Sequence, residues 1–247
     1  MKITAPESIS FAETSFCPGC GHGIVARLIG EVAEEMGLTE KLLTTIDVAC
    51  SSLNVDTWRF DTIMAAHGRP IPTATGIKMV RKENPVLAYM GDGAAYSIGI
   101  SETMYGAIRN DNVMVIVVNN GVYGMTGGQM APTSLKGQKT TSSRKGRDIS
   151  KTGNPFDIVK AIGQFDIAYL ARGSVANAAD IRKTKKYIRK AFEKHMNNEG
   201  YCLVEILSPC PTNVNLGMTP VKCAERVDTV MADFYKTGEY VDKGGNI

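Results

Sequence analysis

The chain has 247 residues, of which 43% are hydrophobic and 21% are charged, and its formal net charge at pH 7 is +3. This length suits one large α/β domain with a substantial core, and the small net charge does not indicate nucleic-acid binding. The N-terminal residues include acids and no apolar core, so we expect no signal peptide. No apolar run approaches the roughly 18 residues of a membrane span. We therefore expect a cytoplasmic protein without nucleic-acid or membrane partners, in which some of the six cysteines serve metal binding or catalysis and none forms a disulfide framework.

Apolar spacing along the chain predicts alternating helices and strands. Helices are expected over residues 24–36, 74–83, 97–109, 154–162 and 176–198, and strands over 42–48, 86–90, 113–118, 166–171 and 201–207. Irregular structure is expected in an N-terminal arm (1–16), a long polar loop (121–153) and a C-terminal tail (211–247) with one helix near 223–236. The alternation predicts a single α/β domain over residues 1–247, with a parallel sheet and helices on both faces.

Two polar turns follow neighbouring strands of this pattern. Gly91-Asp92-Gly93 leaves the strand 86–90, and Asn120 leaves the next strand, 28 residues after Asp92. Ligands of parallel sheets bind where the carboxyl ends of the strands meet. Flanking glycines let the backbone approach a phosphate, and oxygen ligands suit Mg²⁺. Gly91-Asp92-Gly93 alone is more typical of an ordinary turn, but the pair at this spacing favours a site for a diphosphate and Mg²⁺.

The pair resembles the thiamine-diphosphate signature, in which G-D-G is followed one βαβ unit later by an N-N-like ending. Residues 122–129, with the sequence VYGMTGGQ, resemble the Y-x-M-T-G-G-Q loop of the 2-oxoacid:ferredoxin oxidoreductases. This resemblance implies a thiamine-diphosphate-binding fold in which Asp92, the Asn120 side chain and the Val122 carbonyl bind Mg²⁺. The further cofactor contacts that it implies here are Gly91, Gly93, Val122, Tyr123, Met125 and Thr126.

A third stretch, residues 66–78, also matches this family. It contains His67 and Gly68, which on the residues alone are typical of a capped turn with a hydrogen-bonded histidine. The resemblance instead favours His67 and Gly68 as contacts of the cofactor.

The motif C-P-G-C at residues 17–20 precedes a predicted helix and has four interpretations. It is found in thioredoxin-like redox pairs, in half-sites for zinc, in structural cysteine pairs and among the ligands of iron–sulfur clusters. No second C-x-x-C is present, which disfavours zinc. Cys50 and Cys210 follow predicted strands and are natural remote ligands. Cys202 lies inside an apolar strand and Cys223 in a tail helix, so both are expected to be structural.

The resemblance supports the cluster interpretation. In the 2-oxoacid:ferredoxin oxidoreductases, a C-P-G-C-G-H motif, a third cysteine and a fourth in an S-P-C-like element bind a [4Fe–4S] cluster near the thiamine. Cys17, Cys20, Cys50 and Cys210 match those positions. One departure concerns the substrate, because Ala94 follows Gly93 where many 2-oxoglutarate and 2-oxoisovalerate members have a second acid.

Over residues 5–215 the chain resembles the β subunit of these enzymes, of the 2-oxoisovalerate type with the 2-oxoglutarate type next. The family implies coenzyme A-dependent oxidative decarboxylation of a 2-oxoacid to acyl-CoA and CO₂, with electrons passed to ferredoxin. It also implies an α subunit, which supplies the glutamate that activates thiamine diphosphate, and ferredoxin-like γ and δ subunits. No catalytic residue is assigned within this chain, so we expect the chain alone to be inactive.

Two other functions remain open. The diphosphate-binding subunit of a non-oxidative thiamine-dependent 2-oxoacid decarboxylase would use Asp92 and Asn120 but leave four cysteines without a role. A zinc- or cluster-bearing interaction protein would use only the cysteines. The basic residues Arg144, Lys145 and Arg147 could attract an acidic substrate or coenzyme A, or could belong to a solvated surface loop.

Overall fold

A seven-stranded sheet forms the centre of the protein in the computed structural model, which describes residues 6–10 and 14–243. The strand order is β2-β1-β3-β4-β8-β7-β9. The strands are β1 (Leu43–Asp47), β2 (Asp61–Ala65), β3 (Val86–Gly91), β4 (Met114–Asn119), β7 (Tyr169–Ser174), β8 (Cys202–Leu207) and β9 (Gly238–Asp242). In this sheet only the β7–β9 pair is antiparallel. The predicted α/β fold with a parallel sheet is confirmed, with an antiparallel edge strand added.

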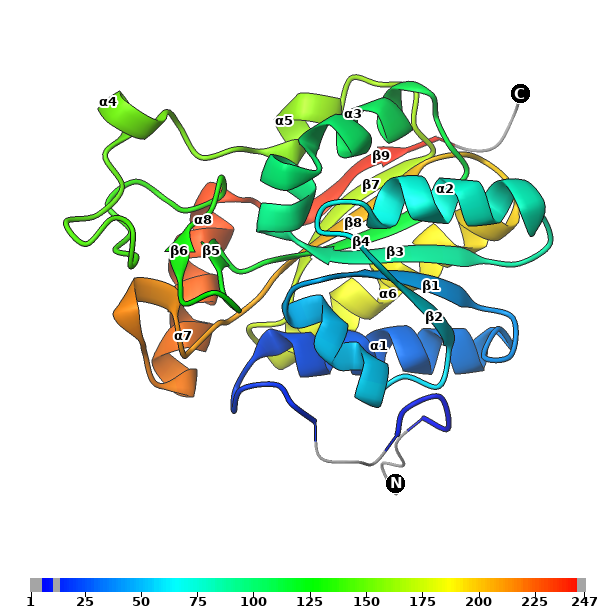
Figure 1. The fold of residues 1–247 in the computed structure, drawn as a ribbon, viewed down its shortest axis with the longest axis horizontal. Coiled ribbons are helices and arrows are strands. Elements are labelled where there is room, and N and C mark those ends of the chain that lie inside the picture. Colours follow the sequence, from blue (N-terminus) through cyan, green and yellow to red (C-terminus); the bar gives the residue numbers. More distant parts are fainter. Residues whose placement is uncertain (1–5, 11–13, 244–247) are drawn as a thin grey trace.

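Helices cover both faces of the sheet (Figure 1). One layer consists of α1 (Gly21–Glu35) and α6 (Ala178–Met196), and the other of α2 (Pro70–Val80), α3 (Ile100–Ile108) and α5 (Ile158–Ile162). Side chains of β4 alternate between the layers: Ile116 packs with the first, and Val115 and Val117 with the second. Because both faces are covered, every residue of β4 is buried, which explains its continuous apolar sequence.

Several boundaries differ from the prediction because local capping or a contact with another element sets them. α2 begins at Pro70 instead of residue 74, with proline in its first turn. α5 begins at Ile158 instead of residue 154, because the Asp157 side chain accepts a hydrogen bond from the Val159 N–H and caps the helix. β7 extends to Ser174 instead of residue 171, where the Ser174 N–H donates to the Thr184 hydroxyl at 2.9 Å.

Some elements were not predicted at all. β2 was missed, as were the 3₁₀ helix η1 (Cys50–Asp56) and the π-helical turn η2 (Ala94–Ile98) before α3. The expected loop 121–153 contains the short hairpin β5 (Val122–Tyr123) and β6 (Gln129–Met130) and the helix α4 (Ile149–Thr152). These pieces are too short to leave a periodic sequence signal.

The C-terminal segment is more ordered than the expected irregular tail. It contains η3 (Val214–Leu216), α7 (Pro220–Arg226), η4 (Val227–Met231), α8 (Ala232–Phe234) and β9, and so includes the helix expected near 223–236. Val227, Met231 and Tyr235 bury their side chains in a small separate cluster with Leu207. This packing orders the segment, in which α7 and α8 lie with β5 and β6 at one end of the sheet while β9 pairs with β7 (Figure 1). That residues 1–247 form one domain stays a prediction, because residues 1–5, 11–13 and 244–247 lie outside the described part.

Within the described ranges, none of the helices combines the length and the apolar character needed to cross a bilayer.

His195, in α6, is buried between the layers and acts as a hydrogen-bond acceptor. Its Nε2 accepts the Val86 N–H at 2.8 Å, and its Nδ1 lies 3.0 Å from Oδ1 of Asn112. Burial, aided by the charge of Lys78, lowers the pKa of His195 from 6.5 to about 3. Nε2 can accept only while it is unprotonated, so the folded chain holds this histidine neutral.

We predict that this histidine makes the chain less stable in acid. Because the folded pKa lies below the unfolded one, the unfolded chain binds the proton more readily, so stability present above pH 6.5 is lost as the pH falls toward about 3. Urea unfolding of the purified chain across this range should show a shallower decline for His195→Gln than for the parent. Parallel declines in the two proteins would contradict the prediction.

Candidate functional site

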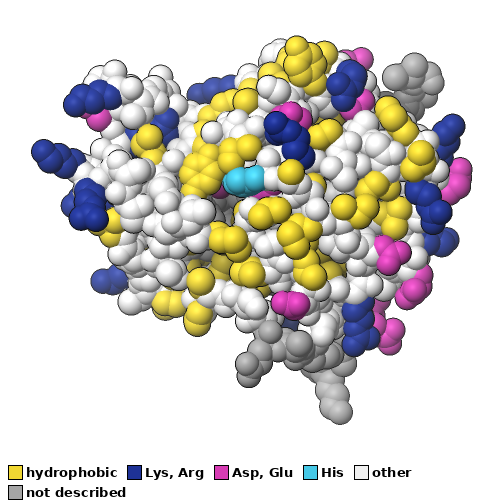
Figure 2. Space-filling view, in the orientation of Figure 1, with side chains coloured by type: hydrophobic (Ala, Val, Ile, Leu, Met, Phe, Trp, Pro, Cys, Tyr) yellow, Lys and Arg dark blue, Asp and Glu magenta, His cyan; other side chains and the backbone are white. Residues whose placement is uncertain are grey.

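A pocket of about 530 Å³, solvent at its mouth included, opens where β1, β3 and β4 end. Its lining consists of His22, Val48, Ala49, Cys50, Ser51, His67, Gly91, Asp92, Gly93, Ala94, Asn120, Val122, Tyr123, Gly124, Met125 and Thr126. Figure 2 shows the hollow on this face, bordered by hydrophobic side chains and by a histidine. Every residue expected to contact the cofactor lines this pocket except Gly68. The fold thus brings together residues from three strand ends that are far apart in sequence.

Asp92 is the buried acid of this pocket, with 2% of its surface exposed. Its Oδ2 accepts hydrogen bonds from the Gly121 N–H, at 3.1 Å, and from the Thr133 hydroxyl. Burial raises the pKa of Asp92 to about 7, although the hydrogen bonds from Thr133, Gly93 and Gly121 oppose the rise. A cation bound beside this carboxyl group would favour its ionised form.

Asn120 and Val122 are joined in a tight turn beside Asp92. The Asn120 Oδ1 accepts the Val122 N–H at 3.0 Å, and Gly121 between them has a φ of 72°, in the left-handed region that glycine enters without strain. Within the described ranges, no three His, Cys, Asp or Glu side chains converge on a single-ion site. The expected Mg²⁺ ligands are instead one carboxylate, one amide and one carbonyl, which are the hard oxygen donors that suit this ion.

The second glycine of the G-D-G motif is required by an aromatic ring. A Cβ on Gly93 would lie 2.3 Å from Cε1 of Tyr123, and the Tyr123 hydroxyl donates to the Gly93 carbonyl at 3.3 Å. Gly91 is not crowded in this way, because the nearest atom to its Cβ position lies 4.0 Å away. The Tyr123 ring is therefore a second reason for glycine at position 93, beside the expected close approach of the backbone to a phosphate.

Asp47, the last residue of β1, was missed by the sequence analysis. It is fully buried and holds the His67 stretch in place, since its Oδ2 lies 2.7 Å from Nδ1 of His67 and its Oδ1 accepts the Gly68 N–H at 2.7 Å. Burial raises the pKa of Asp47, against the opposing effects of the Gly68 N–H and His67. The sequence signal that could have identified Asp47 is an acidic residue at the carboxyl end of a predicted strand. The Gly68 N–H thus holds the same Asp47 side chain that contacts His67, and Gly68 does not line the pocket.

The turn at Cys17 and Cys20 lies against the segment that carries Cys210. The Cys20 N–H donates to the Cys17 carbonyl at 2.9 Å, and the Gly21 N–H donates to the Pro209 carbonyl at 3.1 Å. A Cβ on Gly21 would lie 2.2 Å from the Ser208 Oγ, so only glycine permits this approach. Residues near 20 and 209 are thereby held side by side.

Cys50 and Cys210 meet at the pocket loop. A Cβ on Gly124 would lie 3.4 Å from the Cys50 sulfur and 3.6 Å from the Cys210 sulfur, so both thiols lie beside the same backbone position. The backbone N–H groups of Met125 and Asn213 donate to the sulfurs of Cys50 and Cys210, respectively.

The four cysteines of the predicted cluster site influence one another. Burial raises the pKa of Cys20 and Cys210 to about 12 and also raises that of Cys50. The neighbouring thiols add to the rise: Cys17 and Cys50 at Cys20, and Cys20 and Cys50 at Cys210. Thiols with raised pKa values stay protonated at neutral pH unless a metal or a cluster binds them, because coordination removes the proton.

The remaining cysteines differ from each other. Cys202 is fully buried in β8 and has a core position, as expected. Cys223, in α7, packs with Cys210 in one apolar cluster, and the Cys210 N–H donates to its sulfur. The sequence did not indicate that Cys223 would lie beside the predicted cluster site.

Arg147 is a structural residue and not a free substrate-binding cation. It is 5% exposed, and its guanidinium donates to the carbonyls of Ala131, Pro132, Ser134, Thr152 and Asn154. These bonds close the loop between residues 131 and 154. Arg144 and Lys145 are exposed on that loop.

We predict that Gly93→Ala destabilises the chain, by roughly 1–3 kcal/mol as for other overpacked sites, because its Cβ would overlap the Tyr123 ring. Gly76→Ala is the matched control: it lies in α2 with no atom within 4 Å of its Cβ position, and alanine favours a helix by roughly 0.5–1 kcal/mol. Urea unfolding measures the change in the free energy of unfolding for both substitutions. Adding Tyr123→Ala should remove most of the penalty, and an equal penalty without the ring would contradict the explanation.

Comparison with known proteins supports the sequence resemblance. The family described as "Thiamine pyrophosphate enzyme, C-terminal TPP binding domain" matches residues 46–206. The 2-oxoglutarate:ferredoxin oxidoreductase of Magnetococcus marinus, solved with 2-oxoglutarate, coenzyme A and succinyl-CoA, has a similar fold. Its TM-score is 0.79 at 23% identity, over 97% of this chain and 85% of that one.

Curated relatives are named as subunits of 2-oxoacid oxidoreductases. The ketoisovalerate oxidoreductase subunit VorA of Methanothermobacter marburgensis is 40% identical over 81% of this chain, which spans only 42% of that protein. The 2-oxoglutarate synthase subunit KorB of Archaeoglobus fulgidus is 34% identical over 81% of this chain and 71% of its own length. The 2-oxoglutarate synthase subunit KorB of Methanocaldococcus jannaschii is 35% identical over 80% of this chain and 69% of its own length. Identity at this level over most of both chains, together with the thiamine pyrophosphate domain, means that the chain belongs to the β subunits of the 2-oxoacid:ferredoxin oxidoreductases.

Proposed function

We propose that this chain, assembled with partner subunits, catalyses the coenzyme A-dependent oxidative decarboxylation of a 2-oxoacid and passes the electrons to ferredoxin. The observation that carries the proposal is the position of Gly124. It lines the pocket at the strand ends, and the sulfurs of Cys50 and Cys210 both lie within 3.6 Å of its Cβ position. A thiamine site and an iron–sulfur cluster would thus be neighbours, as electron transfer between them requires.

In this proposal the pocket binds thiamine diphosphate and Mg²⁺. Asp92, the Asn120 side chain and the Val122 carbonyl hold the ion, and the turn at Gly121 keeps them together. Thiamine diphosphate, when bound, supplies the carbanion stabilisation that decarboxylation needs. The protein positions the cofactor: Tyr123, Met125 and Thr126 line the pocket, and His67, oriented by Asp47, presents its other ring nitrogen away from that carboxylate. The further contacts proposed are Gly91, Gly93 and Gly68.

We also propose that Cys17, Cys20, Cys50 and Cys210 bind one [4Fe–4S] cluster. Soft thiolates suit such clusters, and N–H donors to sulfur, here from Met125 and Asn213, tune their potential. A non-oxidative decarboxylase would have no use for this arrangement. The oxidative function is therefore favoured over the alternative that the sequence left open. Six free cysteines fit a reducing cytoplasm, which is the location that we propose.

For the substrate, we propose a branched-chain 2-oxoacid such as 2-oxoisovalerate over 2-oxoglutarate. Among the described residues that line the pocket there is no Lys or Arg to pair with a second carboxylate, and Val48 and Met125 make its rim apolar. The ketoisovalerate oxidoreductase subunit is also more similar to this chain than the 2-oxoglutarate synthase subunits are. The partners proposed are an α subunit that supplies the activating glutamate, ferredoxin-like γ and δ subunits, ferredoxin and coenzyme A.

We predict that the isolated chain has no 2-oxoacid oxidation activity and that the assembled complex does. Ferredoxin reduction in the presence of coenzyme A measures this, and we expect kcat/KM for 2-oxoisovalerate to exceed that for 2-oxoglutarate by 10-fold or more, since an unpaired second carboxylate costs about 1.4 kcal/mol or more. Full activity of the isolated chain would refute the need for partners. A preference for 2-oxoglutarate would refute only the substrate assignment.

The cluster proposal is tested by iron content. In anaerobically prepared complex, Cys17→Ala and Cys210→Ala should each lose about four irons per copy of this chain and retain thiamine diphosphate. Cys202→Ala is the matched control, because Cys202 is equally buried but sits in the core of β8. Unchanged iron in both variants, with thiamine diphosphate still bound, would assign the cluster to another subunit.

A further inference from the structure

The proposed cation ligand Asp92 is held by Thr133, a residue outside the strand ends that carry the expected ligands. Thr133 is fully buried, and its hydroxyl donates to Oδ2 of Asp92. The Gly121 N–H donates to the same oxygen at 3.1 Å. Two donors on one oxygen fix the rotation of the carboxylate and so determine how it faces the pocket.

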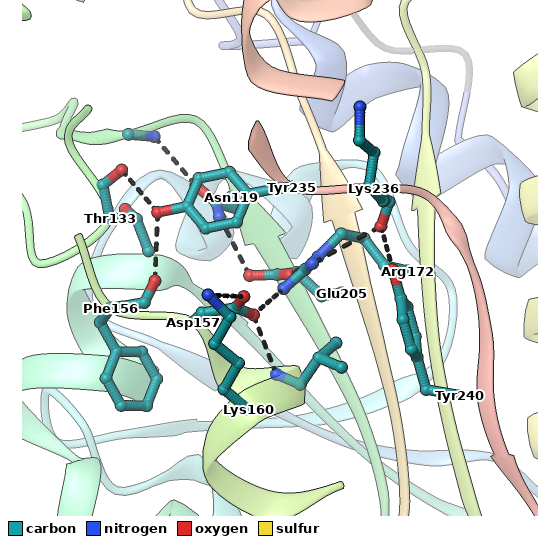
Figure 3. Close-up of polar contacts among 12 residues, drawn as sticks. Asn119, Thr133, Phe156, Asp157, Lys160, Arg172, Glu205, Tyr235, Lys236 and Tyr240 are labelled. Atoms are coloured by element: carbon teal, nitrogen blue, oxygen red, sulfur yellow. Dashed lines mark hydrogen bonds and ion pairs between the residues drawn. The ribbon is translucent and has the colours of Figure 1, made fainter. Parts of the chain in front are cut away.

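Thr133 is itself held by the C-terminal segment. The single proton of the Tyr235 hydroxyl is shared between the Thr133 carbonyl oxygen, at 2.9 Å, and the Phe156 carbonyl oxygen, at 3.1 Å (Figure 3). Tyr235 is fully buried and follows α8, beyond the residues 46–206 that match the thiamine pyrophosphate domain. A segment outside the matched domain therefore reaches the acid of the pocket through one intervening residue.

A buried ion pair supports Tyr235 from its other side. The Arg172 guanidinium lies 5.0 Å from the centre of the Tyr235 ring and pairs with Glu205 and Asp157 (Figure 3). Glu205 also accepts the Asn119 amide at 3.0 Å, and the Asn119 Oδ1 accepts the Gly121 N–H at 3.2 Å.

These contacts form a closed ring around the base of the pocket. In order, its members are Asp92, Thr133, Tyr235, Arg172, Glu205, Asn119 and Gly121, which returns to Asp92. Each member is buried, so the contacts act where water cannot replace them. Removing one polar group leaves its partner unsatisfied and free to reorient.

We propose that Thr133 is a positioning residue that orients the Asp92 carboxylate for Mg²⁺, and that Tyr235 holds Thr133 in place from the C-terminal segment. The proposal rests on the proposed function, because it assigns Asp92 to the cation. Side chains that orient a metal ligand typically change metal affinity 10- to 100-fold when they are removed. The role needs the threonine hydroxyl but not its methyl group, and it needs the tyrosine hydroxyl in addition to the ring that packs on Arg172.

The test compares Thr133→Val, which keeps the shape and loses the hydroxyl, with Thr133→Ser, which keeps the hydroxyl. Mg²⁺ is titrated calorimetrically into the assembled complex at saturating thiamine diphosphate, and the melting temperature is measured in parallel. We expect the dissociation constant for Mg²⁺ to rise about 10-fold or more in Thr133→Val and to stay within about 3-fold of the parent in Thr133→Ser.

Matched controls separate orientation from general stability. Thr184→Val removes an equally buried hydroxyl that donates to the Ser174 carbonyl, and Tyr240→Phe removes a hydroxyl of the same C-terminal segment that donates to the Lys236 carbonyl. Both should leave Mg²⁺ affinity unchanged whatever they do to the melting temperature. Tyr235→Phe should weaken Mg²⁺ binding several-fold, which keeps the proposal testable if Thr133→Val does not fold.

Parent-like Mg²⁺ affinity in Thr133→Val or Tyr235→Phe would overturn the proposal, as would equal weakening in Thr184→Val. Weakening confined to Thr133→Val and Tyr235→Phe, with recovery in Thr133→Ser, would establish it. A parent complex that binds no thiamine diphosphate with Mg²⁺ would overturn the proposed function itself and this inference with it.

Discussion

The buried pair of Glu205 and Arg172 is the interaction on which the arrangement of the site depends. Glu205 on β8 and Arg172 on β7 are each 1% exposed, and an unpaired charge at such a position costs several kcal/mol. Each charge must therefore be satisfied, and the partners that satisfy them come from separate segments. Asn119 at the end of β4 bonds Glu205, while Asp157 at the start of α5 pairs with Arg172. The pair thereby joins the sheet, a helix start and the turn that precedes Asn120.

Close backbone approach is the second constraint, and it brings the cysteines to the pocket. Gly21 permits the Cys17–Cys20 turn to rest on Ser208, and the pocket loop at Gly124 lies beside the sulfurs of Cys50 and Cys210. The Asn213 amide donates to the Gly124 carbonyl at 2.7 Å and ties the two loops together. A Cβ at Gly21 would overlap the Ser208 Oγ and push the Cys17–Cys20 turn away from the segment that carries Cys210. The sulfur and oxygen sites are thus parts of one packed unit.

Much of the fold and of the candidate site could be predicted from the sequence. Apolar runs such as 113–118 indicated central strands, because most side chains of a strand covered on both faces are buried in the core. The G-D-G turn and Asn120 indicated a common site, because parallel strands end at one edge of the sheet. Short elements escaped prediction: β2 at the sheet edge has exposed residues and no clean alternation, and β9 pairs with a strand some 70 residues away in sequence.

What the sequence determined by itself was chemical identity: which residues could bind a diphosphate, a hard cation or a cluster, and which strands could carry them. The tertiary structure alone decided the roles of Asp47, Thr133, Tyr235 and Arg147, none of which lies in a recognisable motif. It also decided that Gly93 accommodates a tyrosine ring and that Gly68 holds the acid that contacts His67. The physical reason is that the spacing of apolar residues along a segment indicates whether it is a helix or a strand and which of its faces is buried. The partner of a buried polar group, by contrast, is set by side chains that packing brings in from distant parts of the chain.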